Sequence, residues 1–212
     1  MPKMKKPHVV EAAPPELARP DWIVVALALA GLAVAGYLTA LKLGGTQAFL
    51  CRGGSGCDLV QASRYSELAG VPTAMWGAGI YLAIAVLAAL PRTARRWQAA
   101  FMLASGAVAF SLYLMYISIF VVGATCPYCL ASGGIAVALL VAMLWRRPSA
   151  QGRHAAAYRP GRLAGLGITA GVFTVLVGAF IFAADFSVPA GYQSALARHM
   201  AKSQAIFYGA FW

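Results

Sequence analysis

Five long apolar runs limit what this chain can fold into. They are Trp22–Leu43, Ala74–Leu90, Ala100–Val122, Pro127–Trp145 and Leu163–Ala184. Each approaches the ~20 residues that a helix needs to cross a bilayer, and the first is too long for the apolar core of a signal peptide. Charged residues make up only 11% of the chain, against about 25% in soluble domains. The sequence predicts an all-α integral membrane protein with five transmembrane helices.

The basic residues lie between these runs and predict the orientation of the chain. Twelve of the 17 Lys and Arg residues lie in the amino-terminal tail, the loop between the second and third runs, and the loop between the fourth and fifth. The positive-inside rule makes that side cytoplasmic, so the amino terminus is expected inside and the carboxyl terminus outside. The charges form no basic face with interleaved aromatic residues, so we expect no nucleic-acid partner.

Four cysteines occur in two pairs, and the predicted topology brings both pairs to the outer face. Cys51 and Cys57 lie in a glycine-rich loop after the first run, and Cys126 and Cys129 form a C-P-Y-C motif at the start of the fourth. Disulfides persist in the outer compartment, so this is where we expect the four cysteines to lie. We take a bacterial inner membrane as the location, with a plastid membrane as the alternative. Two pairs on one face favour electron transfer through disulfides.

The C-P-Y-C motif predicts a reactive cysteine. Pro127 suits the first helical position, which places Cys126 at or next to the N-cap. The positive end of the helix dipole lowers the pKa of a thiol there. Cys129 is expected one turn deeper, facing the bundle, with Cys126 facing outward. A structural disulfide is an alternative, and so is half a zinc site, although the three histidines lie in tails or on the other side; we expect no metal.

The loop between Cys51 and Cys57 contains three glycines among five residues. Glycine frees the backbone, so this pair can open or close at low strain. A mobile loop can bring Cys57 to Cys126 for exchange through a mixed disulfide, leaving Cys51 for an external partner. A static structural bridge is the alternative.

A short helix over Leu59–Ala69 is expected to follow and to cover the bundle. Asp58 suits its N-cap, with Gln61 completing a capping box. Gly70 suits its C-terminal cap, and Pro72 blocks its continuation. These features predict a helix that lies along the outer surface.

Four residues are candidates for contact with a ligand inside the bundle. Ser63 on the short helix either donates a hydrogen bond to a carbonyl below it or faces solvent. The apolar side chains of the third run that share one helical face could line a groove for a quinone tail, or simply pack the bundle; they are Phe110, Leu114 and Ile117.

The order and spacing of these motifs over residues 22–145 resemble the vitamin K epoxide reductase family. The matching residues are Cys51, Cys57-Asp58, Ser63, Gly70-Val71-Pro72 and Cys126-Pro127-Tyr128-Cys129. The resemblance is to the bacterial branch, in which five transmembrane helices lead into a thioredoxin-like domain. It implies a four-helix bundle around a quinone, either ubiquinone or menaquinone, with the fifth helix as a connector.

The resemblance also implies roles for the site residues. Cys126 and Cys129 would be the active-site pair, with Cys129 nearest the quinone. Cys51 and Cys57 would be the shuttle pair, with Cys51 taking electrons from a thioredoxin-like disulfide oxidase. Ser63 would hydrogen-bond the quinone. Animal members carry a tyrosine four residues after the second active-site cysteine, where this chain has Gly133. This departure concerns vitamin K epoxide chemistry and not quinone reduction, which is the activity that the resemblance implies.

The expected organisation has four parts. Residues 1–20 form a cytoplasmic tail, 21–147 the catalytic bundle, and 148–185 a cytoplasmic loop with the fifth helix. Residues 186–212 form a linker and the first strand of a truncated thioredoxin-like domain, because the ending Tyr-Gly-Ala-Phe-Trp is similar to the strand before that domain's own cysteines. The predicted protein is a membrane thiol:quinone oxidoreductase that drives disulfide formation in exported proteins. The alternatives are a scaffold with two static disulfides, a metal-binding or transport protein, and an epoxide or quinone reductase without a disulfide-forming role.

Overall fold

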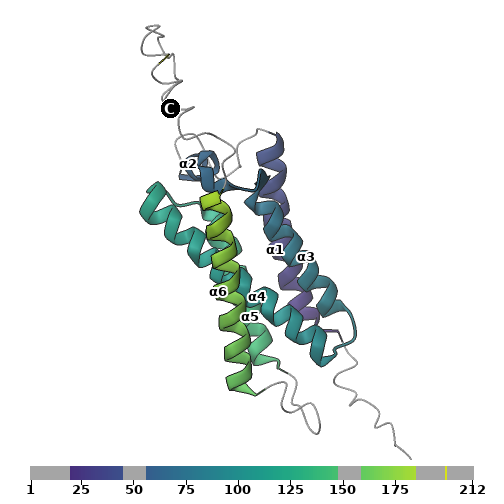
Figure 1. The fold of residues 1–212 in the computed structure, drawn as a ribbon. Coiled ribbons are helices and arrows are strands. Elements are labelled where there is room, and N and C mark those ends of the chain that lie inside the picture. Colours follow the sequence, from purple (N-terminus) through teal and green to yellow (C-terminus); the bar gives the residue numbers. More distant parts are fainter. Residues whose placement is uncertain (1–19, 45–55, 148–158, 185–198, 200–212) are drawn as a thin grey trace, which may run out of the picture.

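A computed structural model describes residues 20–44, 56–147, 159–184 and 199 of the protein (Figure 1). The helices are α1 (Trp22–Gly44), α2 (Gly56–Ala62), α3 (Thr73–Ala89), α4 (Ala94–Ile117), α5 (Pro127–Trp145) and α6 (Pro160–Ala184). The 3₁₀ turn η2 (Arg64–Ser66) and the strands β1 (Glu67–Leu68) and β2 (Val71–Pro72) lie between α2 and α3. A π-helical turn, η3 (Ser118–Val122), extends α4. The predicted cytoplasmic tail, Cys51 and almost all of the predicted carboxyl-terminal linker and strand lie outside the described residues.

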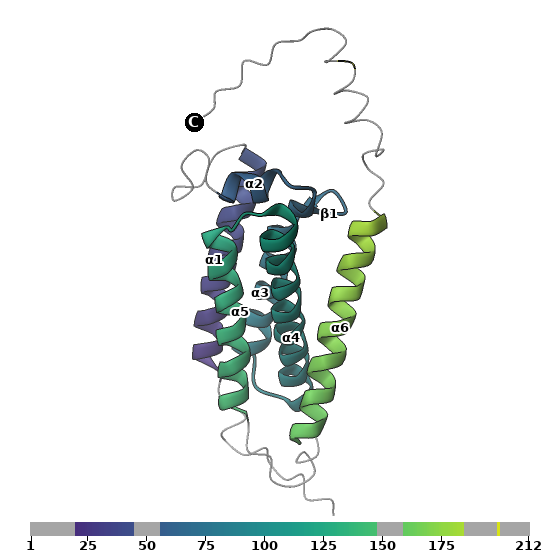
Figure 2. The same ribbon diagram turned by 90° about the vertical axis from the view of Figure 1, so that its left-hand side faces the viewer.

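Four of the helices form a closed ring. Helix α1 packs against α3 and α5, and α4 packs against α3 and α5. Helix α6 packs against the outside of the ring along α4, and α2 lies across one end of the bundle (Figures 1 and 2). The predicted all-α membrane fold is confirmed, with a four-helix bundle and one further helix.

The five predicted spans correspond to α1, α3, α4 with η3, α5 and α6. Four of these helices are long and apolar enough to cross a membrane, while α3, with 17 residues, is shorter. Helix α4 begins six residues before the predicted apolar run. Thr93 starts it by accepting a hydrogen bond from the backbone N–H of Arg96, so its first turn is polar and hydropathy alone could not find it.

Small residues let the helices approach closely, as is common where lipid surrounds a bundle. A Cβ atom added to Gly31 of α1 would lie 2.5 Å from the ring of Tyr81 on α3. A Cβ atom on Gly178 of α6 would lie 2.4 Å from the ring of Phe110 on α4. The outer surface of α6 is instead covered by large exposed apolar side chains such as Leu176 and Phe180, which suit contact with lipid.

An ion-pair cluster closes the end of the bundle opposite α2. Asp21, which precedes α1, forms a hydrogen-bonded ion pair with Arg92 from the α3–α4 connection. Arg146, just after α5, places Nε 3.2 Å from the other carboxylate oxygen without good hydrogen-bond geometry. The backbone N–H of Asp21 also donates to the carbonyl oxygen of Ala88, at 3.2 Å. One buried carboxylate therefore joins three segments of the ring.

The predicted helix Leu59–Ala69 is wrong in its second half. Helix α2 ends at Ala62 because both the backbone N–H and the hydroxyl of Ser63 donate to the carbonyl oxygen of Val60, at 3.2 and 2.7 Å. The chain then forms η2 and the β1–β2 hairpin. The hairpin turn is Ala69-Gly70, with φ of 55° and 74°, and positive φ at both positions is typical of two-residue hairpins.

Two expected caps therefore serve other purposes. Gly70 supplies a hairpin turn and not a helix end. Asp58 lies inside α2, which begins at Gly56, and not at its N-cap. The capping-box pattern of Asp58 and Gln61 therefore misplaced the start of the helix. A local pattern takes no account of the tertiary contacts that decide where a helix begins.

Candidate active site

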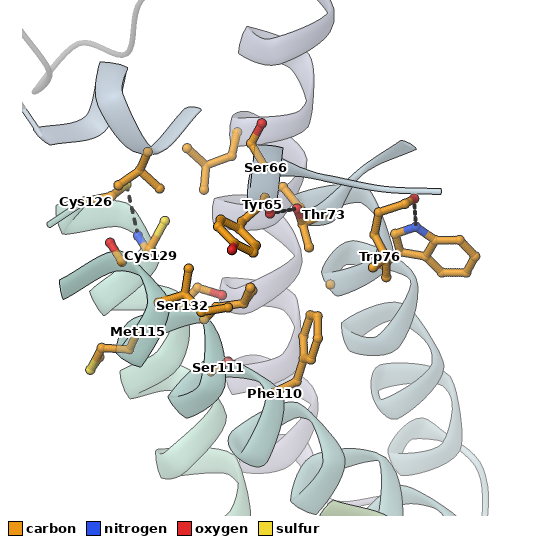
Figure 3. A pocket seen from close by; sticks show the side chains of 18 of the residues that line it. Tyr65, Ser66, Thr73, Trp76, Phe110, Ser111, Met115, Cys126, Cys129 and Ser132 are labelled. Carbon is orange, nitrogen blue, oxygen red and sulfur yellow. Dashed lines mark hydrogen bonds between the residues drawn. The ribbon is translucent and has the colours of Figure 1, made fainter. Parts of the chain in front are cut away.

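A cavity of about 370 Å³ lies inside the bundle beneath α2 and the hairpin. Its walls come from α1, α3, α4, α5 and α6, and its roof from residues between Val60 and Pro72. Figure 3 shows Cys126 and Cys129 on one side of it, with Tyr65, Ser66 and Thr73 facing them across the upper part. The lining is mostly apolar with a few hydroxyl groups, as is usual for sites that bind apolar ligands.

Cys126 lies at the N-cap of α5, as predicted, with Pro127 at the first helical position. Its Sγ accepts a hydrogen bond from the backbone N–H of Cys129, at 3.4 Å. The hydrogen bond from the Cys129 thiol, aided by the backbone N–H groups of Cys129 and Tyr128, lowers the pKa of Cys126 to about 6, although burial acts in the opposite direction. Cys126 is therefore prepared to be a thiolate at neutral pH.

The outward direction predicted for Cys126 is wrong. Its side chain is only 2% exposed, because it is covered by Cys57 of α2 with Leu41, Val60 and Tyr128 around them. Both cysteines of the motif are free, and Cys129 is the exposed one. Cys129 lines the cavity, so it faces into the bundle as predicted.

Cys57 provides the link between the loop and the C-P-Y-C motif. It is disulfide-bonded and 2% exposed, and it packs directly against Cys126. Cys51, the other residue of the predicted shuttle pair, lies outside the described residues. The structure thus brings Cys57 and Cys126, one cysteine of each predicted pair, together in a buried contact. Cys129 lies on the cavity side.

The four candidate ligand contacts all line the cavity: Ser63, Phe110, Leu114 and Ile117. The hydroxyl of Ser63 donates to Val60, so it must rotate before it can donate to a ligand. The ring of Phe110 stacks on Phe182 of α6, with centroids 6.5 Å apart and planes 4° from parallel.

Lys42 lines the cavity, and the sequence alone predicted no role for it. Its Nζ donates to the carbonyl oxygen of Gln61 at 2.7 Å and to Ser66 Oγ at 2.9 Å, and it lies 3.2 Å from the Glu67 carboxylate. Lys42 therefore fastens α2, η2 and β1 to the end of α1. The usable signal was a single charge at the end of an otherwise apolar run, where such residues usually have a partner.

A second fastening joins the roof to α6. Arg64 donates to the carbonyl oxygen of Phe182 at 2.9 Å, and the rings of Tyr65 and Phe182 meet edge to face. Helix α6 also lines the cavity through four residues, which are Phe173, Thr174, Val177 and Gly178. The fifth helix is thus part of the cavity wall and more than the connector that was expected.

Deeper in the cavity lies a polar group that the sequence did not reveal. Tyr81 of α3 donates to the main-chain oxygen of Ser132 on α5 at 2.7 Å, and its hydroxyl lies 3.0 Å from Ser132 Oγ. Tyr81 can cross the bundle because Gly31 leaves room for its ring. Both residues line the cavity, as does Ser111 on α4 (Figure 3).

Residues 22–144 match the model of the vitamin K epoxide reductase family. This match covers more than half of the chain, spans the four helices of the ring and includes all four cysteines. The chain therefore belongs to the vitamin K epoxide reductase family and is a membrane oxidoreductase of the quinone and thiol type.

Proposed function

We propose that the protein is a thiol:quinone oxidoreductase that drives disulfide formation in exported proteins. Electrons would enter from a reduced thioredoxin-like protein at Cys51 and Cys57, pass to Cys126 and Cys129, and leave to a quinone. One observation carries the proposal. Cys126 is buried against Cys57, while its partner Cys129 opens onto an apolar cavity.

The cavity suits a quinone. Its volume of about 370 Å³ lies within the ~300–1,000 Å³ typical of small-molecule sites. Phe110, Leu114 and Ile117 offer apolar surface to the ring or tail, while Ser63 and the hydroxyls of Ser111 and Ser132 offer partners for carbonyl oxygens. A bound quinone, ubiquinone or menaquinone, would accept two electrons and two protons.

The transfer between the pairs balances as two exchanges. The Cys57 thiolate attacks Sγ of Cys126 in a Cys126–Cys129 disulfide, which forms the Cys57–Cys126 bond and releases Cys129 as a thiolate. Cys51 then attacks Cys57 and releases Cys126. A thiol with a pKa of about 6 leaves readily, because low-pKa thiols are better leaving groups.

The redox state in the structure fits the end of this transfer. Cys57 is in a disulfide, and Cys126 and Cys129 are free. In this state the electrons are on the pair that lines the cavity, next to where the acceptor would bind. The hydrogen bonds that stabilise a Cys126 thiolate leave Cys129 as the thiol nearest the acceptor.

We further propose that the end of the bundle holding Cys57 and Cys126 faces the outside of a bacterial inner membrane. Arg92 and Arg146 lie at the opposite end, in the flanks that carry most of the positive charge. That distribution supports a cytoplasmic location for this opposite end.

The test is anaerobic quinol formation by the purified protein, with a reduced thioredoxin-like protein or dithiothreitol as donor and ubiquinone and menaquinone analogues as acceptors. The unsubstituted protein should form quinol, and Cys126→Ala and Cys129→Ala should not. Thr169→Ala is a matched control, because the hydroxyl is exposed and bonds only to its own helix. Quinol formation by Cys129→Ala, or none by the folded unsubstituted protein, would refute the proposal and favour static disulfides.

A further inference from the structure

The start of α2 lies unusually close to the segment that leads into α5. A Cβ atom added to Gly56 would be 2.5 Å from the carbonyl oxygen of Thr125 and 2.8 Å from its backbone nitrogen. Both are backbone atoms, which cannot rotate away as the tip of a side chain can. Only glycine permits this contact, so the need here is for the absence of a side chain and not for unusual backbone angles.

This contact is one residue away from both buried cysteines. Gly56 precedes Cys57, and Thr125 precedes Cys126. The two cysteine side chains are each 2% exposed and pack together, with Leu41, Val60 and Tyr128 around them. The distance between the backbones at Gly56 and Thr125 therefore sets how closely the two sulfur atoms can approach.

We propose that Gly56 is a positioning residue for electron transfer between the two cysteine pairs, an inference that rests on the proposed function. In the first exchange the Cys57 thiolate bonds to Sγ of Cys126, the Cys126–Cys129 bond breaks, and its electron pair goes to Sγ of Cys129. A side chain at position 56 would move α2 away from Thr125 on the order of 0.5–1 Å, and misplacing reacting groups by 1 Å can lower a rate about 100-fold.

The chain offers a matched control for the added methyl group. Gly134 lies on α5, the same helix as Cys129, and a Cβ atom there would meet nothing within 4 Å. Gly134→Ala adds the same group to a helix of the site without a steric conflict. A difference between the two substitutions therefore reports the Gly56–Thr125 contact.

The direct test uses the full chain with Cys51→Ala and Cys129→Ala, which leaves the thiols of Cys57 and Cys126. Diamide oxidises the two thiols to one disulfide by accepting two electrons and two protons, and alkylation followed by mass spectrometry gives its rate of formation. This doubly substituted protein, the parent for the comparison, should form the Cys57–Cys126 bond in its folded state. Adding Gly56→Ala should slow it by about 10-fold or more, whereas Gly134→Ala should leave it unchanged.

Two results would overturn the proposal. One is that the folded Cys51→Ala, Cys129→Ala protein does not form the Cys57–Cys126 bond. This result can be obtained even if Gly56→Ala does not fold, because it uses no substitution at Gly56. The other is a rate for Gly56→Ala within about twofold of the parent. No quinone is involved, so failure of quinone reduction leaves this measurement intact, and the two claims can fail separately.

Turnover separates positioning from a merely structural effect. With a thioredoxin-like donor, Gly56→Ala in the otherwise unsubstituted protein should lower kcat by about 10-fold without raising the KM for quinone, because only the transfer between pairs is slowed. If Gly56 only supported the roof of the cavity, the KM for quinone would rise instead. That outcome would contradict the proposal.

Discussion

Sγ of Cys126 accepts a hydrogen bond from the backbone N–H of Cys129, 3.4 Å away in the first turn of α5. Cys126 also packs against Cys57. Cys126 therefore lies between the loop cysteine Cys57 and its motif partner Cys129. Hydrogen bonds explain why the buried Cys126 thiol has a lowered pKa. The bond from the Cys129 thiol contributes most, and the backbone N–H groups of Cys129 and Tyr128 add to it.

The lowered pKa predicts the pH dependence of Cys126 in the reduced motif. Its alkylation rate should rise with pH around a midpoint of about 6, against an ordinary value of 9.0. Cys129→Ala removes the strongest hydrogen bond and should shift the midpoint upward. Mass spectrometry of the modified peptide would measure both. A midpoint near 9 in the unsubstituted protein would contradict the assignment.

The same shift has a consequence for stability. Because the folded pKa lies below the unfolded one, the ionised thiol stabilises the reduced fold. The contribution is complete above about pH 9 and is lost as pH falls through about 6. Unfolding of the reduced protein in this pH window, compared with Cys126→Ser, should show the difference.

Lys42 is predicted to hold the roof over the cavity. Lys42→Met removes two hydrogen bonds to Gln61 and Ser66, so the KM for quinone should rise by about 3–10-fold, as expected for a loss of roughly 1 kcal/mol. Glu67→Gln is the control, because that side chain is 49% exposed and an exposed ion pair contributes little. Equal effects of the two substitutions would show that the ion pair, and not the hydrogen bonds, holds the roof.

Helix α6 is predicted to shape the cavity through Gly178. Gly178→Ala places a Cβ atom 2.4 Å from the ring of Phe110, so the ring must move from its stack on Phe182 toward the cavity. Quinone binding should weaken by about 5-fold or more, equivalent to roughly 1 kcal/mol. Gly165→Ala on the same helix, with nothing within 4 Å, should bind quinone as the unsubstituted protein does. Unchanged binding in Gly178→Ala would remove α6 from the cavity wall.

Asp21 is predicted to matter for stability and not for chemistry. Its side chain is 6% exposed, so Asp21→Asn, which removes the buried negative charge from the ion pair with Arg92, should cost about 3 kcal/mol in the free energy of unfolding. Arg146→Gln should cost less than about 1 kcal/mol, because Arg146 is 48% exposed. Denaturant unfolding in detergent micelles would measure both. Lower turnover per folded molecule in Asp21→Asn would contradict the purely structural role.

The fold could largely be predicted from sequence, because long apolar runs leave a chain in a membrane few choices. Helix α5 matches its predicted run from Pro127 to Trp145, since proline fixes its start and Arg146 follows its end. The N-cap position of Cys126 followed from the same local rule. Such features depend on neighbouring residues only.

What could not be predicted depends on contacts between distant segments. The helix after Cys57 stops at Ala62 because Ser63 turns back on Val60 and a hairpin follows. Burial of Cys126 needs α2 to lie over it, and the Gly56 contact needs Thr125 opposite. The grouping of Asp21 with Arg92 and Arg146 likewise joins residues up to 125 positions apart, for which one sequence has no signal.

The most direct test of the central claim is a single turnover of protein whose Cys126 and Cys129 are reduced, mixed with quinone without oxygen. Quinol would be measured by absorbance, and the remaining thiols would be alkylated and mapped by mass spectrometry. The account predicts that each quinol formed is matched by the loss of one thiol at Cys126 and one at Cys129. Quinol formed while these two thiols remain free would contradict it.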